Sequence, residues 1–222
     1  KVWTRNFLLI ILINFLVFMN HIMVLSTFPM FLEQVLGLNE AVAGAAAFAF
    51  SAVAVILRPI IGWLLDCGRR RGVLLIGLTG MLLMPLGYAA SAAFTAAVAL
   101  ALVCRMLHGA ALAFSNTTGA TIVSDALPQK RFAEGMGYFG MATALATSLA
   151  PALGLALMKV GFTVLFLTAS GFMLISLLLC LMMKPLSVPQ AEKKPLDFKT
   201  LIDADAVPAS VICLVFLLTW GA

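Results

Sequence analysis

Charged side chains are scarce in this sequence. Only 10% of its 222 residues are Asp, Glu, Lys or Arg, whereas 63% are hydrophobic and the mean hydropathy is +1.12. A soluble domain carries about 25% charged residues, so this chain cannot cover a surface that faces water. A lipid bilayer is therefore its expected environment, and the chain is predicted to be an integral membrane protein.

The residue groupings that enzymes and metal sites need are missing as well. The sequence has no Ser-His-Asp grouping at one depth, no metal-ligand spacing among its cysteines and no phosphate-binding loop. We therefore expect no enzyme activity, no metal and no cofactor. The net charge of +5 comes from basic residues scattered between apolar runs, which argues against a nucleic-acid partner. No Asp or Glu lies deep in any apolar run.

Six apolar runs are long enough to cross a hydrocarbon core of about 30 Å. They cover about Asn6–Phe31, Ala41–Leu65, Gly72–Ala90, Ala96–Val123, Ala133–Met158 and Phe162–Met183. The first run lacks the cleavage site of a signal peptide and is expected to be retained. These runs predict an all-α bundle of six transmembrane helices over residues 1–183.

After this predicted bundle the composition changes twice. Residues 184–205 hold three prolines and mixed charges, which predicts a flexible linker. Residues 206–222 are apolar again, but about 17 residues is the short limit for a span, so we expect only the start of a seventh one. Because the chain begins at Lys1 rather than Met, we also expect native residues to be missing before it.

The basic residues predict the orientation of the bundle. Loops on the opposite side from the N-terminus hold only Lys159, and Arg58 and Arg105 lie within spans. All other basic residues belong to the N-terminal side: Lys1, Arg5, Arg69, Arg70, Arg71, Lys130, Arg131, Lys184, Lys193, Lys194 and Lys199. By the positive-inside rule, the N-terminus and the linker are predicted to be cytoplasmic.

The turn between the second and third runs carries the most specific motif. It reads Gly62-Trp63-Leu64-Leu65-Asp66-Cys67-Gly68-Arg69-Arg70-Arg71. Gly62 is expected to let helices approach, Gly68 to permit a tight turn, and Asp66 to pair with the following arginines. This turn resembles the signature loop between helices two and three of the major facilitator superfamily, although the basic residue that usually follows Asp66 is absent.

Three further motifs resemble the same family. Arg105-Met106-Leu107-His108-Gly109 is similar to its fourth-helix pattern, with His108 where glutamine is common. Asp125, Pro128, Arg131 and Gly135 resemble its loop between helices four and five. Gly137, Ala146, Ala150, Pro151 and Gly154 keep the spacing of its antiporter signature, with alanine at two glycine positions. Pro151 and Gly154 are expected to bend or thin this helix so that it can rock against a neighbour.

The resemblance implies an architecture and a set of partners. In this family twelve helices form two halves around a midplane site, so the chain would be the N-terminal half with the start of helix seven. It would then need the missing C-terminal half or a second copy of itself. The turn around Asp66, Arg69 and Arg70 would latch onto that other half and stabilise the outward-facing state. The alternative is that the turn is a positive-inside anchor only.

Arg105 is the most costly residue for a membrane protein to insert. It lies about nine residues into the fourth run, hence roughly 13 Å deep, where an arginine costs about 2.5–3.5 kcal/mol on insertion scales. It must face the bundle interior or a wet cavity. At 100° per residue, Asn116 lies within about 20° of its direction and His108 about 60° away. We expect either a structural arginine or a site for an anion or for charge coupling.

The first run presents a second polar face. Asn14, Phe18, His21, Leu25 and Phe28 share it, and His21 falls near the same depth as Arg105. A histidine titrates at about 6.5 when unperturbed, which suits a proton carrier, but a lone buried histidine is often structural. Asn20 and Thr27 lie on another face and are expected to bond between helices.

Together these features favour a secondary transporter in the plasma (inner) membrane that exports a small organic molecule by alternating access with proton coupling. Two alternatives stay open. One is an uptake symporter or facilitator, and the other is a non-transporting receptor or assembly subunit built on the same bundle.

Overall fold

Six long helices, each apolar enough to cross a membrane, make up the part of the chain that the computed structural model describes. That part covers residues 2–91 and 97–184, together with 208 and 211. The helices are α1 (Arg5–Gln34), α2 (Glu40–Asp66), α3 (Arg70–Ser91), α4 (Ala97–Ala126), α5 (Phe132–Val160) and α6 (Phe162–Leu181). The six predicted spans are confirmed, each to within about three residues. The predicted linker (184–205) and seventh span (206–222) lie outside the described residues, apart from 184, 208 and 211.

Local sequence signals account for the helix ends. The Thr4 hydroxyl accepts a hydrogen bond from the Phe7 amide at 3.2 Å, and the Asn39 side chain accepts one from Val42, so both residues cap free N–H groups. Between α4 and α5, Pro128 precedes the short 3-10 helix η1 (Gln129–Arg131). A helix satisfies its backbone hydrogen bonds internally, which is why these apolar segments adopt no other structure in lipid.

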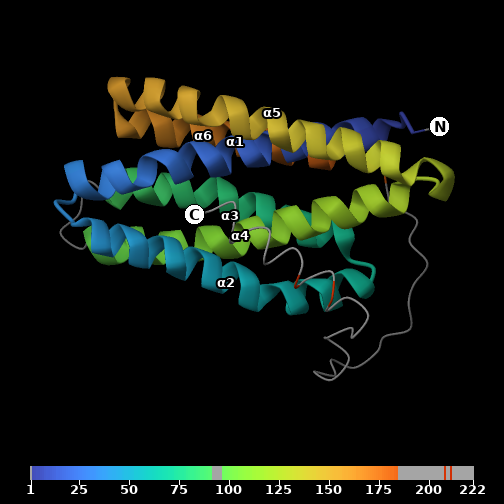
Figure 1. The fold of residues 1–222 in the computed structure, drawn as a ribbon, viewed down its shortest axis with the longest axis horizontal. Helices are drawn as coiled ribbons and strands as arrows, with labels where there is room; N and C mark the ends of the chain where they lie inside the picture. Colours follow the sequence, from blue (N-terminus) through green and yellow to red (C-terminus); the bar gives the residue numbers. More distant parts are fainter. Residues whose placement is uncertain (1, 92–96, 185–207, 209–210, 212–222) are drawn as a thin grey trace. The chain divides into compact units, whose positions relative to one another are not determined.

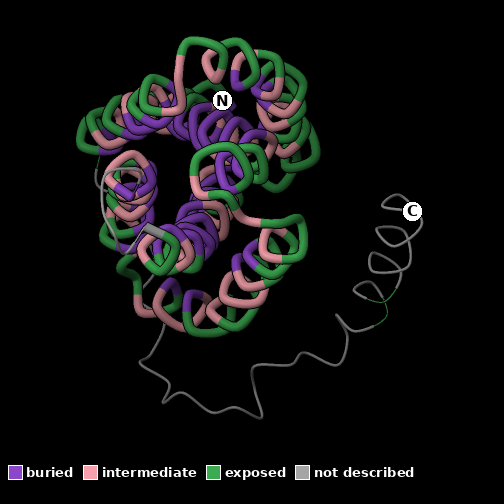
Figure 2. Tube along the Cα trace, turned by 90° about the vertical axis from the view of Figure 1, so that its left-hand side faces the viewer, coloured by how far each residue is buried: buried purple, intermediate pink, exposed green. Residues whose placement is uncertain are grey.

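The helices associate in two groups of three. In Figure 1, α1, α5 and α6 run side by side, and α2, α3 and α4 form the second group. Contacts of α3 with α6 and of α1 with α4 join the groups. Viewed along the helices, the buried positions turn toward the inside of the bundle and the exposed positions turn outward (Figure 2). Exposed apolar side chains on the outside suit a lipid solvent.

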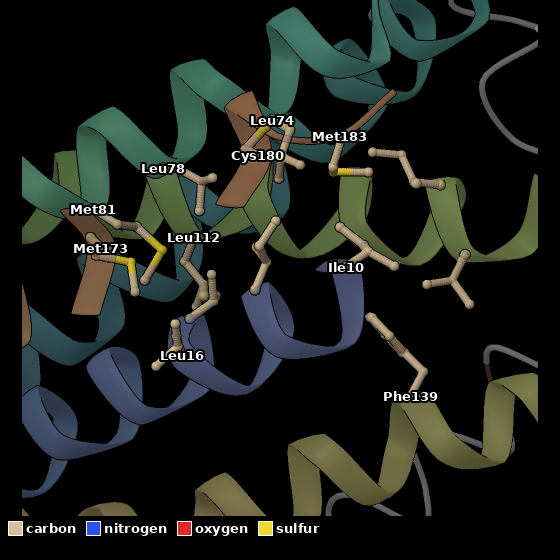
Figure 3. Close-up of a cluster of buried hydrophobic side chains, with 14 of the residues drawn as sticks. Ile10, Leu16, Leu74, Leu78, Met81, Leu112, Phe139, Met173, Cys180 and Met183 are labelled. Atoms are coloured by element: carbon tan, nitrogen blue, oxygen red, sulfur yellow. The ribbon is translucent and has the colours of Figure 1, made fainter. Parts of the chain in front are cut away.

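Two large apolar clusters fill the bundle and follow one another along its length. The first lies toward the end that holds the N-terminus, and Figure 3 shows Ile10, Leu78, Leu112 and Met173 converging in it from four helices. The second is rich in aromatic rings and includes Phe28, Phe31, Tyr88 and Phe166. The polar residues discussed next lie at the edge of this aromatic cluster.

Candidate functional site: a buried arginine in the bundle

The side chain of Arg105 on α4 is only 1% exposed and is the largest fully buried side chain in the described chain. Its Cζ atom lies over two aromatic rings, 4.6 Å from the centroid of Phe28 on α1 and 4.4 Å from that of Phe50 on α2. A guanidinium over a ring face gains about 2 kcal/mol or more when it is shielded from water. The prediction that Arg105 faces inward is therefore confirmed, and aromatic rings provide part of its stabilisation.

Hydrogen bonding leaves this guanidinium incomplete. Its Nε and Nη1 atoms are buried and have no hydrogen-bond partner in the described chain, although the group also interacts with Tyr88. No carboxylate balances its charge there either, because every described acidic residue is exposed: Glu33, Glu40, Asp66, Asp125 and Glu134. Arg105 is thus a buried cation with spare donors, which is costly unless something else supplies an acceptor.

His108, one turn further along α4, is the centre of a closed hydrogen-bond network. Its Nε2 lies 3.1 Å from Oδ1 of Asn20 on α1, and its Nδ1 lies 3.1 Å from the Tyr88 hydroxyl on α3. Asn20 also donates to the Ala169 carbonyl of α6 at 2.8 Å, so its Oδ1 faces His108 as an acceptor. A neutral ring with its proton on Nε2 would donate to Asn20 and accept from Tyr88 through Nδ1, while the Tyr88 hydroxyl also lies 3.3 Å from the Cys104 carbonyl oxygen, to which it can donate instead.

This network joins α1, α3, α4 and α6, so its first role is structural. The prediction that Asn20 bonds between helices is confirmed. The same prediction is wrong for Thr27. Its hydroxyl donates to the Met23 carbonyl of its own helix at 2.9 Å and makes no hydrogen bond to a neighbouring helix in the described chain. The hydroxyls of Ser and Thr have this local alternative because the carbonyl four residues back is always within reach.

His21 differs from His108 because one of its ring nitrogens makes no hydrogen bond in the described chain. Its Nδ1 is buried without a hydrogen-bond partner in the described chain. The ring stacks on Phe50, with centroids 5.3 Å apart and planes inclined by 7°, and meets the edge of Phe18 at 6.4 Å. Phe50 thus contacts both His21 and Arg105, which brings the two predicted residues together through a ring that sequence reasoning missed.

Gly109 explains how Phe50 comes so close to α4. A Cβ atom added at Gly109 would collide with the Phe50 carbonyl oxygen and lie 3.0 Å from its carbonyl carbon. Only glycine allows the backbones of α2 and α4 to approach this closely. The same interface leaves an apolar groove of about 560 Å³, whose walls include Ala46 and Ala49 of α2 and Leu102 and Met106 of α4.

Comparison with known proteins identifies the family. The family model described as Major Facilitator Superfamily matches residues 10–221. The chain belongs to this superfamily. No curated protein matches the sequence. The predicted resemblance to this superfamily is thereby confirmed.

Solved structures of superfamily transporters share the fold. A POT family transporter in complex with a thioalcohol-conjugated peptide matches 97% of this chain at 17% identity with a TM-score of 0.75. The human organic anion transporter MFSD10 (TETRAN) matches 89% of it at 21% identity with a TM-score of 0.71. The chain covers 47% and 52% of these two structures, so it spans about half their length. The six helices therefore match half of a superfamily fold.

The superfamily loop motif is arranged differently from the expectation. Gly68 has a φ of 77°, as a tight turn requires. Asp66 is the expected partner of the arginines, and it interacts electrostatically with Arg70, but the salt bridge joins Arg70 of α3 to Asp125 at the end of α4. Asp66 and Arg69 are exposed at the same turn. The motif thus connects the two loops of this end, which spacing along one loop does not reveal.

The second loop and α5 hold the other predicted motif residues. Arg131 binds Glu134 with its Nε at 2.7 Å from Oε2, so it does not share Asp125 with Arg70. In α5, a Cβ at Gly154 would lie 3.1 Å from the Met23 carbonyl oxygen, so glycine at this position lets α5 pack closely against α1. Pro151 lies within the continuous helix α5.

Four other predicted residues lie apart from the Arg105 cluster or make no close contact. A Cβ added at Gly62 or at Gly137 meets no atom of the described chain within 4 Å. The expectation that Gly62 permits close packing is therefore wrong for the described helices. Asn14 is buried, but its amide donates to Thr143 of α5 at 2.8 Å. Asn116 is half-buried on α4.

Proposed function

We propose that this chain is one half of a secondary transporter that moves a small organic molecule by alternating access. Membership of the superfamily and the likeness to half of solved transporters support this function. The observation that carries it is Arg105, a buried cation with spare donors inside a bundle of membrane-spanning helices. Such residues in membrane helices mark substrate or ion pathways, because a purely structural role would rarely offset their insertion cost.

We place the N-terminus and the linker (184–205) in the cytoplasm, and the protein in the plasma (inner) membrane. The excess of basic residues at the helix ends on the N-terminal side supports this orientation. Residues 1–183 form the bundle, and residues 206–222 begin helix seven. The partner in the transport cycle is a C-terminal half or a second copy, against which the turn at Asp66 and Arg70 acts as a latch. In this proposal, Asn14, Asn116 and His108 line the route of the transported molecule and of the proton.

Proton-coupled export is the favoured direction and coupling. The partial antiporter motif of α5 supports it, and His21 is the favoured proton carrier because its Nδ1 has no hydrogen-bond partner among the described residues while both ring nitrogens of His108 are engaged. Neutral imidazole is the side chain whose charge changes most readily between pH 5 and 8. Movement of Gly154 and Pro151 against α1 would rock this helix during the cycle.

A second candidate is proton-coupled uptake. His21 and Arg105 both contact Phe50, so a proton on His21 would add a second positive charge beside the guanidinium. A negatively charged solute on Arg105 would offset that repulsion, which favours binding of the solute and the proton together. Joint binding is the condition for symport.

Proteoliposomes that contain the full-length protein and a luminal pH dye separate these functions. As an outward-directed solute gradient empties the vesicles, antiport is expected to acidify the lumen and symport to make it alkaline. Solute flux with no change in luminal pH, unaffected by a proton ionophore, would refute proton coupling. Absence of flux for every solute tested, with correctly inserted protein, would refute transport and favour the receptor alternative.

A further inference from the structure

The charge of Arg105 has no counter-charge among the residues that the structure describes. We infer that this site binds the carboxylate of a singly charged organic anion with an apolar body, an inference that rests on the proposed transport function.

The spare donors of Arg105 call for an acceptor from outside the described chain. Nε and Nη1 are both buried without a hydrogen-bond partner in it. Of the polar groups around it, Tyr88 interacts with the guanidinium but is also bonded to His108, and His108 is bonded to Asn20. An arginine has no acceptor of its own and stays charged, so an anion is the ligand that satisfies both its donors and its charge.

The charge balance selects a monoanion. Arg105 is the only buried Lys or Arg side chain among the described residues. A monocarboxylate would neutralise it, and the site would then carry no net charge. With His21 and His108 neutral, a phosphate monoester or a dicarboxylate would bring a second negative charge that no described residue in the interior balances, and burying such a charge is strongly unfavourable.

The surroundings select a flat head and an apolar body. The faces of Phe28 and Phe50 lie against Cζ of Arg105, and ring faces carry negative charge that repels an anion. The ligand therefore approaches the N–H donors away from the rings, which suits a planar carboxylate better than a tetrahedral head. The groove of about 560 Å³ between α2 and α4, with Ala49 and Met106 in its walls, has the size of a small-molecule site and an aliphatic lining.

Matched ligands test the inference on the purified full-length protein in detergent. Thermal stabilisation is measured at neutral pH with phenylacetate, phenylacetamide and phenethylamine, which share one body and differ in charge. A second series uses the corresponding 1-naphthyl compounds, and benzylphosphonate supplies a tetrahedral head. The acids are expected to stabilise the protein at concentrations at least tenfold below those of their amides and of benzylphosphonate. If neither acid is preferred over its amide, the inference is wrong.

Three variants assign the preference to Arg105. Arg105→Gln is expected to abolish the difference between acid and amide, whereas Arg58→Gln removes an exposed arginine of α2 and should keep it. Arg105→Lys keeps the charge but not the planar guanidinium, so its preference for the acid is expected to fall at least threefold. Size-exclusion chromatography reports folding, and if Arg105→Gln does not fold, Arg105→Lys decides. An unchanged preference in either folded Arg105 variant overturns the inference.

Flux measurements with the same compounds separate this inference from the proposed function. Transport of the amides or amines at rates equal to the acids, and unaffected in the Arg105 variants, would overturn the carboxylate site and leave transport in place. Selective binding of the acids without flux of any compound would leave the site in place and overturn transport.

Discussion

Replacing Gly109 by alanine is the sharpest structural test of the α2–α4 interface. The added Cβ would lie 3.0 Å from the carbonyl carbon of Phe50 and 3.1 Å from its Cα, and it would overlap the carbonyl oxygen. These are backbone atoms, so no side-chain rotation relieves the overlap. The two helices must separate, and the ring of Phe50 then moves away from Arg105.

The size of the effect follows from two opposing contributions. Overpacking an interface costs about 1–3 kcal/mol, and exchanging glycine for alanine within a helix recovers about 0.5–1 kcal/mol. Because a backbone rather than a flexible side chain must move, we expect a net loss of about 1–2 kcal/mol. For a chain of this size, that loss lowers the melting temperature by roughly 2–8 °C.

The assay is thermal unfolding of the full-length protein in detergent, followed by tryptophan fluorescence. Gly171→Ala is the matched control, because a Cβ at Gly171 in α6 meets no atom of the described chain within 4 Å. The control is expected to be at least as stable as the original protein. If Gly109→Ala melts at the same temperature as Gly171→Ala, the close approach of α2 and α4 is wrong.

Three further predictions follow from single contacts. Asn20→Ala should lower the free energy of unfolding by about 1–3 kcal/mol, measured by thermal unfolding, because the buried groups that Asn20 bonds would lose their partner. A loss no larger than that of Asn39→Ala, which removes an exposed helix cap, would contradict this. Arg70→Asp and Asp125→Arg should each lower the free energy of unfolding by up to about 1 kcal/mol, and the double variant should recover most of that loss in a double-mutant cycle. Purely additive losses would show that the ion pair does not contribute to stability. In a Cys213→Ser background, a membrane-impermeant maleimide should label Cys67 at the α2–α3 turn only after the cytoplasmic side is opened; labelling in intact cells would reverse the proposed orientation.

Sequence patterns predicted some members of the site and missed others. Arg105 and His21 were found because a charged or titratable group inside an apolar run is costly wherever the helix packs. Phe50, Phe28 and Tyr88 were not singled out as site residues, since aromatic side chains are common in apolar runs and none signals its neighbour. The close approach at Gly109 had a sequence signal in the fourth-helix pattern, but the partner on α2 had none.

Asn14 and the turn at Asp66 show why the partners of the polar side chains could not be predicted from the sequence. Helical periodicity placed Asn14 on the same face as His21, yet its amide binds Thr143 of α5. Spacing along the turn suggested that Asp66 pairs with Arg70, yet Asp125 from another loop forms the ion pair. In both cases the partner comes from a segment more than 50 residues away in the sequence.

The sequence by itself determined that this protein lives in lipid, that it forms six spanning helices, and that Arg105 points inward. Each of these follows from the cost of placing charge or unpaired backbone groups in hydrocarbon, which depends on composition and run length alone. Only the tertiary structure decided which groups satisfy one another. It left Arg105 with two aromatic rings, a partner in Tyr88 and spare donors, because the packing of α1, α2 and α4 sets which side chains reach the guanidinium.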